Sequence, residues 1–203
     1  TIRRYASMFG LNRPSGIEIP ETTPELTTED PERSAMGQGT NSYSNVQLSR
    51  YVAAIANSGT VFDLSLLDKI TDSEGNLIQD FTPEATGHVD IADSTWDAVH
   101  QGMRAVITDG SVNKIFQDLE VEIAGKTGTA QESRTRGNHA FFISYGPYTN
   151  PEICVTVNIP YGYSSSNAAM VAKNVYRFYY GYTDLESILG SGALEVSNVK
   201  VGD

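Results

Sequence analysis

Apolar residues recur with the 3.6-residue period of a helix in several segments of the chain, and the first segment lies at its start. In residues 2–9 the apolar side chains fall at i, i+3, i+4 and i+7, and Gly10 is a typical residue just beyond a helix end. A second helix is predicted to begin at Ser44, because Ser44 and Gln47 have the spacing of a capping box. One apolar face then continues until the Ser-Gly pair at residues 58–59, which stops the helix.

Two further helices are predicted later in the chain. One is capped by Ser94, with Asp97 three residues on, and runs to Gly110. Trp96 lies on the apolar stripe of this helix, which indicates a core residue. The other helix ends at Gly181, and its apolar face needs a sheet to cover it. The residues expected on that face are Ala168, Val171, Ala172, Val175, Phe178 and Tyr179.

Elsewhere the pattern is that of strands. Residues 66–71 and 77–81 flank the turn-forming residues 72–76 and predict a β-hairpin. Later runs joined by short polar loops predict an antiparallel meander, and they cover residues 121–131, 139–145 and 152–160. The combination of helices with such a sheet indicates an α+β fold.

Two segments carry no regular period. Residues 10–43 are rich in Pro, Gly, Thr and Ser and predict a long, mostly irregular connection. Loops of this length are often functional or held by tertiary contacts, and Gln38 with its neighbouring glycines is expected to hold this one in place. Residues 184–203 are expected to form a loosely held C-terminal tail after a domain that covers residues 1–183.

Composition and charge exclude several functions. Of the 203 residues, 39% are hydrophobic and 19% are charged, which is the profile of a globular protein. The 25 acidic residues outnumber the 14 basic ones and give a formal net charge of −11. This charge disfavours nucleic acids and anionic membrane surfaces as partners, because both require clustered Lys and Arg. The scattered histidines lack metal-site spacing, so no metal or other cofactor is predicted.

The single cysteine and the chain ends add little chemistry. Cys154 lies in an apolar strand-like run and is expected to be a buried structural thiol. No stretch approaches the ~20 apolar residues of a membrane-spanning helix, and no signal peptide is recognisable. The chain does not start with Met, and residues 1–5 have the pattern of a helix interior. We therefore expect it to begin inside a domain, with any anchor or export signal outside this sequence.

The residues with the clearest chemical pattern are Gly125-Lys126-Thr127-Gly128-Thr129-Ala130-Gln131, on the first strand of the meander. A Lys-Thr-Gly triplet alone is a weak signal, since an ordinary exposed edge strand would also explain it. The context is more specific, because it adds a strand, a glycine where a substrate backbone can approach closely, and a second threonine. Lys-Thr-Gly on a strand is the third signature of serine β-lactamases and penicillin-binding proteins.

From about residue 1 to about residue 180 the chain resembles class B penicillin-binding proteins, with the matching segments in that family's order. The resemblance is carried by residues 5–11 (YASMFGL), 15–21 (SGIEIPE), 35–39 (AMGQG), 47–59 (QLSRYVAAIANSG), 124–131 (AGKTGTAQ) and 139–142 (HAFF).

The resemblance implies a fold and a reaction. The family has a β-lactamase/transpeptidase-like antiparallel sheet with packed helices, of which this chain is expected to be the C-terminal part only. Its members are peptidoglycan DD-transpeptidases that β-lactams inhibit. A serine in Ser-x-x-Lys attacks the D-Ala-D-Ala carbonyl of a stem peptide, releases the last D-Ala, and passes the acyl group to an amine of a neighbouring stem. An upstream segment of the same domain is expected to supply Ser-x-x-Lys and Ser-x-Asn.

By the same resemblance, the catalytic and substrate-binding residues of this chain are expected on one strand. Lys126 would place a positive charge in the cleft, assist proton transfer, and attract the substrate's terminal carboxylate. The hydroxyls of Thr127 and Thr129 would donate hydrogen bonds to that carboxylate. The Thr129 N–H would form half of the oxyanion hole, which supplies ~3–4 kcal/mol per donor in comparable enzymes. Gly128 would let the substrate lie along the strand edge as an added β-strand.

Other matches to these signatures have structural explanations. Ser111-Val112-Asn113-Lys114 spells both Ser-x-x-Lys and Ser-x-Asn, but it lies only a few residues before Lys126 and directly after a helix end. A capped turn explains it better. Residues 165–167 spell Ser-x-Asn where the last helix needs an N-cap.

Residues near the cleft of the family are assigned with alternatives. Arg134 and Arg136 follow the Lys-Thr-Gly strand, and solvated loop arginines are preferred to contacts with a substrate or inhibitor carboxylate. A structural role is preferred for His139 at the start of the next strand. Residues 161–163 (Tyr-Gly-Tyr) fit either an aromatic lip of the cleft or a surface turn.

The leading functional hypothesis is a DD-transpeptidase to which this chain contributes the Lys-Thr-Gly wall but no nucleophile. A non-catalytic penicillin-binding-like sensor or scaffold is the alternative, and an upstream Ser-x-x-Lys would distinguish the two. A β-lactamase or carboxypeptidase is disfavoured by the long class B similarity and by Thr129-Ala130-Gln131.

The isolated chain is expected to be inactive and unable to complete its sheet, because the family takes further strands from upstream. Partners implied by the resemblance are peptidoglycan stem peptides and β-lactam antibiotics, with a cell-wall glycosyltransferase as a further candidate. The implied location is the outer face of the bacterial cytoplasmic membrane.

Overall fold

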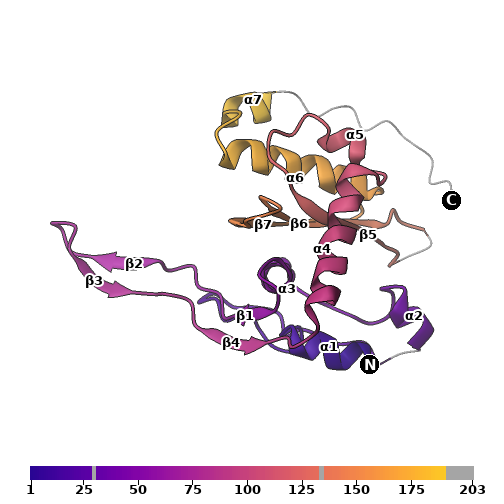
Figure 1. Cartoon of the computed structure of the whole chain (residues 1–203), viewed down its shortest axis with the longest axis horizontal. Coiled ribbons are helices and arrows are strands. Elements are labelled where there is room, and N and C mark those ends of the chain that lie inside the picture. The colour runs from indigo at the N-terminus through magenta and orange to yellow at the C-terminus, as the bar shows by residue number, and fades with distance from the viewer. Residues whose placement is uncertain (29–30, 133–134, 191–203) are drawn as a thin grey trace. The chain divides into compact units, whose positions relative to one another are not determined.

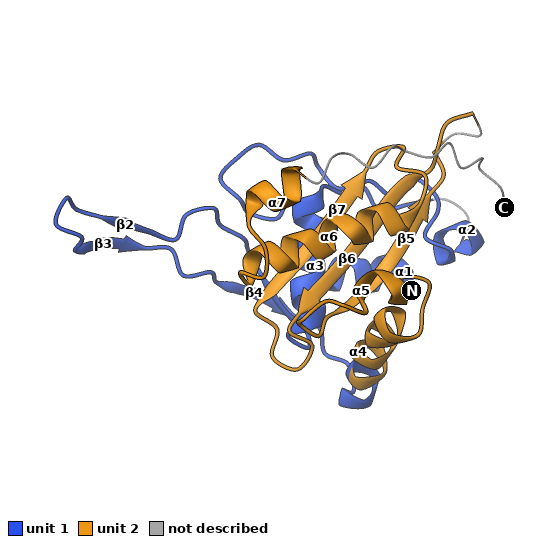
Figure 2. Cartoon of the chain, turned by 90° about the horizontal axis from the view of Figure 1, so that it is seen from above, with its two compact units in different colours: residues 1–96 blue, residues 97–203 orange. Residues whose placement is uncertain are grey.

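The computed structural model describes residues 1–28, 31–132 and 135–190, and the chain divides into two compact units, Thr1–Trp96 and Asp97–Asp203 (Figure 2). Helix α4 (Asp93–Thr108) spans the boundary between them. The other elements of the first unit are α1 (Ile2–Met8), α2 (Pro31–Ala35), α3 (Asn45–Ala56), β1 (Thr60–Phe62), β2 (Lys69–Thr71), β3 (Leu77–Asp80) and β4 (Ala85–His88) (Figure 1). Those of the second unit are α5 (Asn113–Phe116), β5 (Ala124–Ala130), β6 (His139–Gly146), β7 (Ile153–Ile159), α6 (Ser165–Tyr179) and α7 (Leu185–Gly190).

Local sequence signals set the ends of the helices in the first unit. Helix α1 ends in a Schellman motif, in which Gly10 has φ +76° and the Leu11 N–H donates to the carbonyl of Ala6 (2.9 Å). Helix α3 begins with the predicted capping box. The Ser44 hydroxyl accepts from the Gln47 N–H (3.2 Å), and the Gln47 side chain accepts from the Ser44 N–H (3.0 Å). These predicted boundaries are confirmed.

Helix α4 starts two residues earlier than predicted. The helix begins at Asp93, so Ser94 lies in its first turn and is not the cap. Trp96 is 5% exposed, which confirms that it is a core residue. Its ring lies edge-on to Phe9 at a centroid distance of 6.1 Å.

The connection of residues 10–43 is held by a buried arginine and contains the short helix α2, which the sequence did not predict. Arg50 donates from its guanidinium to the carbonyls of Pro14 (2.6 Å), Arg13 (2.8 Å) and Gly10. Its side chain is only 1% exposed. The start of the loop is therefore fixed by tertiary hydrogen bonds, because residues 10–16 belong to no helix or strand.

A carboxylate holds a second part of this loop. Glu21 accepts from the backbone N–H of Ser15 (2.6 Å) and from the Ser44 hydroxyl at the start of α3 (3.2 Å). These hydrogen bonds lower the pKa of Glu21 against the opposing effect of burial, the largest single influence on the group. Gln38 donates its backbone N–H to the Arg33 carbonyl (3.0 Å), which closes the end of α2.

The predicted hairpin is present, and Figure 1 shows it extending from the rest of its unit. Strands β2 and β3 pair antiparallel, with Lys69 opposite Asp80 and Ile70 opposite Gln79. Strands β1 and β4 form a second antiparallel pair that the sequence did not predict. These strands are too short, at three and four residues, to show a clear period of two.

The predicted meander is present as a three-stranded antiparallel sheet in the order β5-β6-β7. Helix α6 packs on β6 and β7 and, with α5, covers one face of this sheet (Figure 2). The buried residues of this core are Ile107, Val112, Phe116, Ile123, Ala140, Phe142, Val155, Ala168, Ala169, Ala172 and Tyr176. The α+β class predicted from the sequence is confirmed.

The face that α6 presents to the sheet is rotated from the predicted one. Val175 and Phe178 were expected against the sheet, yet they are 39% and 52% exposed. The same correction applies to Val171 and Tyr179, whereas Ala168 and Ala172 are fully buried as predicted. The reason is that alanines let the helix approach the sheet closely, and Tyr176 is anchored there because its hydroxyl donates to the Ser144 hydroxyl (3.0 Å).

The segment predicted as a tail begins with helix α7, which the sequence pattern did not reveal. Asp184 accepts from the Ser187 N–H (2.6 Å) in the first turn. Leu185 and Leu189 are 52% and 72% exposed. The remainder of the predicted tail, residues 191–203, lies outside the described residues.

Candidate active-site strand

Strand β5 carries the Lys-Thr-Gly segment on an edge of the sheet. It pairs only with β6 among the described strands, with Lys126 opposite Ile143 and Thr129 opposite Ala140. Every second backbone N–H and C=O of an edge strand points away from its neighbour. An extended peptide can therefore pair with β5 along this edge.

Glycines allow the backbone of β5 to pack closely on its neighbour. A Cβ built on Gly125 would lie 2.7 Å from the Phe142 ring and 3.0 Å from the Ile143 carbonyl oxygen. A Cβ on Gly128 would lie 3.3 Å from the Cβ of Phe141, a tighter contact than most but not a collision. The stricter need for glycine is thus at Gly125, where the strand passes over the core.

The polar side chains of the segment leave β5 on alternating faces. Lys126 is exposed, and its ammonium donates to the carbonyl of Thr127 (2.7 Å). Thr127 lies opposite Phe142, a buried core residue, and Thr129 is exposed at the end of the strand. The Lys126 side chain lies on one face of β5 and those of Thr127 and Thr129 lie on the other, so a cation and hydroxyls flank the unpaired edge of the strand, which suits a peptide that carries a carboxylate.

The loop after β5 is tied to the turn between β7 and α6 by polar side chains. The Glu132 carboxylate accepts from the Tyr161 hydroxyl (3.0 Å) and lies 3.1 Å from Nε2 of His139. Hydrogen bonds from His139 and then from Tyr161 lower the pKa of Glu132. Arg136 donates to the Tyr161 hydroxyl (2.9 Å) and lies over its ring. Of the predicted arginines, Arg136 thus has a partner in the chain, and Arg134 lies outside the described residues.

The turn between β7 and α6 contains the Tyr-Gly-Tyr segment. Tyr161 and Tyr163 have positive φ angles, 55° and 63°, which bulky residues adopt rarely. Tyr163 is 53% exposed, and its backbone N–H donates to the carbonyl of Asn138 (3.0 Å). The segment is a strained surface turn that is fastened to the neighbouring loop. Glu132 was not singled out from the sequence, because its partners lie 7 and 29 positions away and share no pattern.

The segments that spell signature motifs elsewhere have structural roles. Ser111 is exposed in the turn before α5, and the Asn113 side chain donates to the carbonyls of Ile107 (3.3 Å) and Thr108 at the end of α4. The predicted N-cap of α6 lies one residue earlier than expected, at Ser164, whose hydroxyl accepts from the N–H of residue 166 (3.3 Å). Asn113 thus caps the end of α4, and residues 165–167 form the first turn of α6.

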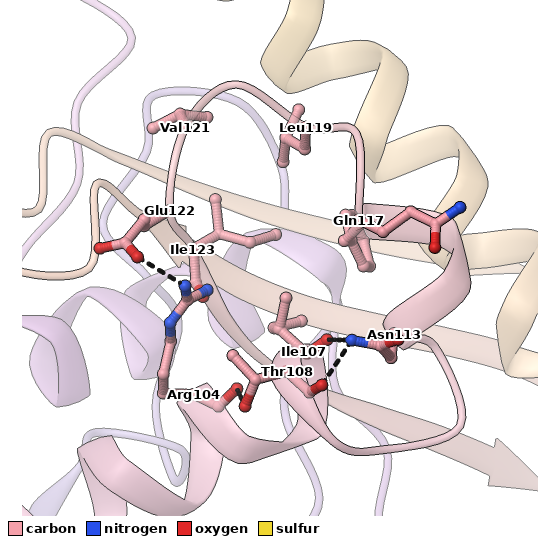
Figure 3. A pocket seen from close by; sticks show the side chains of 10 residues that line it. Arg104, Ile107, Thr108, Asn113, Gln117, Leu119, Val121, Glu122 and Ile123 are labelled. Carbon is pink, nitrogen blue, oxygen red and sulfur yellow. Dashed lines mark hydrogen bonds and ion pairs between the residues drawn. The ribbon is translucent and has the colours of Figure 1, made fainter.

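A pocket of about 240 Å³ lies between the end of α4, α5 and the residues that lead into β5 (Figure 3). Its polar groups are largely paired with one another. Arg104 donates to the carbonyl of Ile123 (2.8 Å) and to the carboxylate of Glu122 (2.8 Å), as the dashed line in Figure 3 marks for the ion pair. Arg104 thereby fastens the start of the Lys-Thr-Gly strand to α4, a role that the sequence did not indicate.

Cys154 is the one cysteine among the described residues, 1–28, 31–132 and 135–190. Cys154 is half-buried on β7, and burial raises the pKa of its thiol to about 11, which fits the predicted structural role. No group of three or more His, Cys, Asp and Glu side chains in these ranges could hold a metal ion. Nor does any helix within them have the length and apolar character needed to cross a membrane.

Comparison with known proteins relates this arrangement to characterised sequences. The family model described as the penicillin binding protein transpeptidase domain matches residues 1–177. Penicillin-binding protein 2A of Bacillus subtilis is 31% identical over 186 residues, which are 82% of this chain and 26% of that protein. The peptidoglycan D,D-transpeptidase MrdA of Haemophilus influenzae is 29% identical, over 84% of this chain and 31% of that protein.

Solved structures show the same relationship. Penicillin-binding protein 2B of Streptococcus pneumoniae superposes with a TM-score of 0.78 and 27% sequence identity, over 91% of this chain and 33% of that one. The chain thus spans about a third or less of the length of these relatives.

Proposed function

This chain belongs to the penicillin-binding protein transpeptidase family, and from this premise we propose that it forms one wall of the active site of a peptidoglycan D,D-transpeptidase. The observation that carries the proposal is the placement of Lys126-Thr127-Gly128-Thr129 on β5, at an edge that pairs with no other described strand. A stem peptide that ends in D-Ala-D-Ala is extended, carries a terminal carboxylate, and so matches this edge in shape and charge.

In this proposal each residue of the segment has a separate role. The Lys126 ammonium, exposed and free to leave its own strand's carbonyl, attracts the terminal carboxylate and assists proton transfer. Thr127 and Thr129 donate hydroxyl hydrogen bonds to that carboxylate, and Gly128 leaves room for the substrate backbone. The Thr129 N–H stabilises the oxyanion that forms when the nucleophile attacks the carbonyl.

The nucleophile in this proposal is a serine outside the present chain. Its hydroxyl oxygen bonds to the carbonyl carbon, the C–N bond to the last D-Ala breaks, and the departing amine takes a proton. The acyl group then passes to an amine of a neighbouring stem and the serine is regenerated. A β-lactam ring is opened by the same attack and remains on the serine.

An upstream part of the domain is proposed to complete the sheet and to cover α6. Strand β7 has one unpaired edge in the described part of the chain. On α6, the apolar side chains of Val171, Val175 and Phe178 are 39–52% exposed, more than a core helix normally leaves in water. The complete protein is proposed to act on the outer face of the cytoplasmic membrane, where a cell-wall glycosyltransferase is a candidate partner.

The proposal is tested with a fluorescent penicillin on the whole transpeptidase that contains this chain. We expect Lys126→Ala to slow acylation of the protein by about 10²-fold or more, because a charge in the cleft is lost. Lys114→Ala is the matched control, since it removes an exposed lysine from Ser111-Val112-Asn113-Lys114, outside the proposed site, and should leave the rate unchanged. An unchanged rate in the Lys126 variant would overturn the assignment of this strand.

The isolated chain provides a second test. We expect it to gain no mass from penicillin, because it contributes no nucleophile. A penicillin adduct on this chain itself would point to Ser111, and absence of any adduct on the whole protein would favour a non-catalytic sensor or scaffold.

A further inference from the structure

Glu132, His139 and Tyr161, here called the clamp, form a closed set of hydrogen bonds that the proposed reaction does not use. Glu132 lies in the loop after β5, His139 opens β6, and Tyr161 follows β7. The Glu132 carboxylate accepts from the Tyr161 hydroxyl (3.0 Å) and lies 3.1 Å from Nε2 of His139. Three chain segments are thus joined at one carboxylate.

The hydrogen bonds of the clamp assign the histidine tautomer. The Tyr161 backbone N–H donates to Nδ1 of His139 (3.3 Å), so Nδ1 must present a lone pair. The proton of the neutral ring then sits on Nε2, where it is donated to Glu132. The Tyr161 residue thus contacts His139 through its backbone and Glu132 through its hydroxyl, and the rings of His139 and Tyr161 lie 4.8 Å apart.

The turn that the clamp holds is strained. Tyr161 and Tyr163 have φ angles of 55° and 63°, in a region that bulky residues adopt only when surrounding contacts impose it. The turn is held by the clamp, by Arg136, which donates to the Tyr161 hydroxyl (2.9 Å), and by the hydrogen bond from the Tyr163 N–H to the Asn138 carbonyl (3.0 Å). Backbone strain of this kind concentrates where a protein fixes a functional geometry.

The clamp acts at the end of β5 that carries the proposed oxyanion donor. His139 is paired directly with Ala130, and the next pair is Thr129 with Ala140. The opposite edge of β5 has no strand partner in the described residues. The position of Thr129 is therefore set from one side only, through β6 and through the clamp that joins both strands to the β7–α6 turn.

We propose that the clamp is a positioning device for acyl transfer, which holds the Thr129 end of β5 in the geometry that stabilises the oxyanion. Glu132, His139 and Tyr161 are positioning residues, since they act through Thr129 and do not touch the substrate. This inference rests on the proposed transpeptidase function of the strand.

The test measures penicillin acylation by stopped flow in the whole transpeptidase, so that the dissociation constant and the acylation rate constant are separated. Tyr161→Phe removes only the hydroxyl, which donates to Glu132 and accepts from Arg136. We expect it to lower the acylation rate constant about tenfold, because a small misplacement of a catalytic group is costly. The dissociation constant and the thermal unfolding midpoint should change little. Tyr163→Phe is the matched control from the same turn and should leave the rate constant unchanged.

A second pair of variants separates positioning from general stability. His139→Ala should slow acylation at least as much as Tyr161→Phe, and His139→Gln should restore part of the rate because its amide N–H can reach Glu132.

Wild-type rate constants in Tyr161→Phe and His139→Ala would overturn the clamp while leaving the transpeptidase proposal intact. An equal loss in Tyr163→Phe, or no rescue by His139→Gln, would also overturn it. A wild-type protein that penicillin does not acylate at all would refute the proposed function and, with it, this inference.

Discussion

Replacement of Arg50 by methionine should loosen the connection of residues 10–15 while leaving the helix that carries it in place. The Arg50 side chain is 1% exposed and donates to the carbonyls of Gly10, Arg13 and Pro14. Burial is the main cause that lowers the pKa of Arg50, and Asp63 at 3.6 Å opposes this effect. Methionine fills similar volume but donates no hydrogen bond.

The loss of stability expected for Arg50→Met follows from the hydrogen bonds that the variant lacks. Hydrogen bonds from a charged donor contribute about 1.5–3 kcal/mol each. Removal of the arginine also removes the cost of burying its charge, so the sum of the bonds overstates the loss. Breaking a buried charged network by deleting one partner typically costs about 3–5 kcal/mol. We therefore expect the substitution to lower the free energy of local opening of this loop by about 3 kcal/mol, at the low end of that range. The low end applies because some of the carbonyls hydrogen-bond to water once the loop opens.

Hydrogen exchange of backbone amides is the appropriate assay, since it resolves local opening within the whole protein. A loss of about 3 kcal/mol corresponds to roughly a 10²-fold faster exchange of the protected amides in residues 10–15. Arg4→Met is the control, because it makes the same chemical change at an exposed site on α1. Unchanged exchange in the Arg50 variant, or equal acceleration by Arg4→Met, would refute the view that this arginine holds the loop.

Further predictions concern the strand, its loop and the cysteine. Gly125→Ala should destabilise the protein by about 1–3 kcal/mol through overpacking against Phe142, measured by chemical denaturation, whereas an unchanged midpoint would contradict the packing argument. The pKa of Glu132 is lowered in the fold, so its stabilising contribution is present above the ordinary carboxyl pKa of 4.5 and lost as the pH falls through the lower folded value. The difference in thermal midpoint between wild type and Glu132→Gln should therefore shrink as the pH falls through and below 4.5; a difference that does not change there would argue against it. Burial raises the pKa of Cys154 to about 11, so iodoacetamide should label the folded protein at pH 7 far more slowly than the unfolded protein, and equal rates would contradict this.

Local sequence patterns determined the elements whose stability comes from near neighbours along the chain. The capping box at Ser44 and the glycine at Gly10 act over three to five residues, so their geometry follows from spacing alone. The same is true of the β2–β3 hairpin and of the strand period that identified the β5-β6-β7 meander. The motif at Lys126–Thr129 could also be recognised from the sequence, because a strand places consecutive chemical groups in a fixed order along an edge.

Only the tertiary structure decided the features that depend on partners distant in sequence. The apolar stripe of α6 did not specify which of its sides faces the sheet, because close approach of alanines and the buried hydroxyl of Tyr176 outweighed the larger residues Val175 and Phe178. The glycine requirement at Gly125 arises from the ring of Phe142 across the strand pair. The assembly of Glu132 with side chains from other strands likewise has no spacing rule. Such contacts join residues that are far apart in the sequence, so no periodic pattern of residue types predicts them.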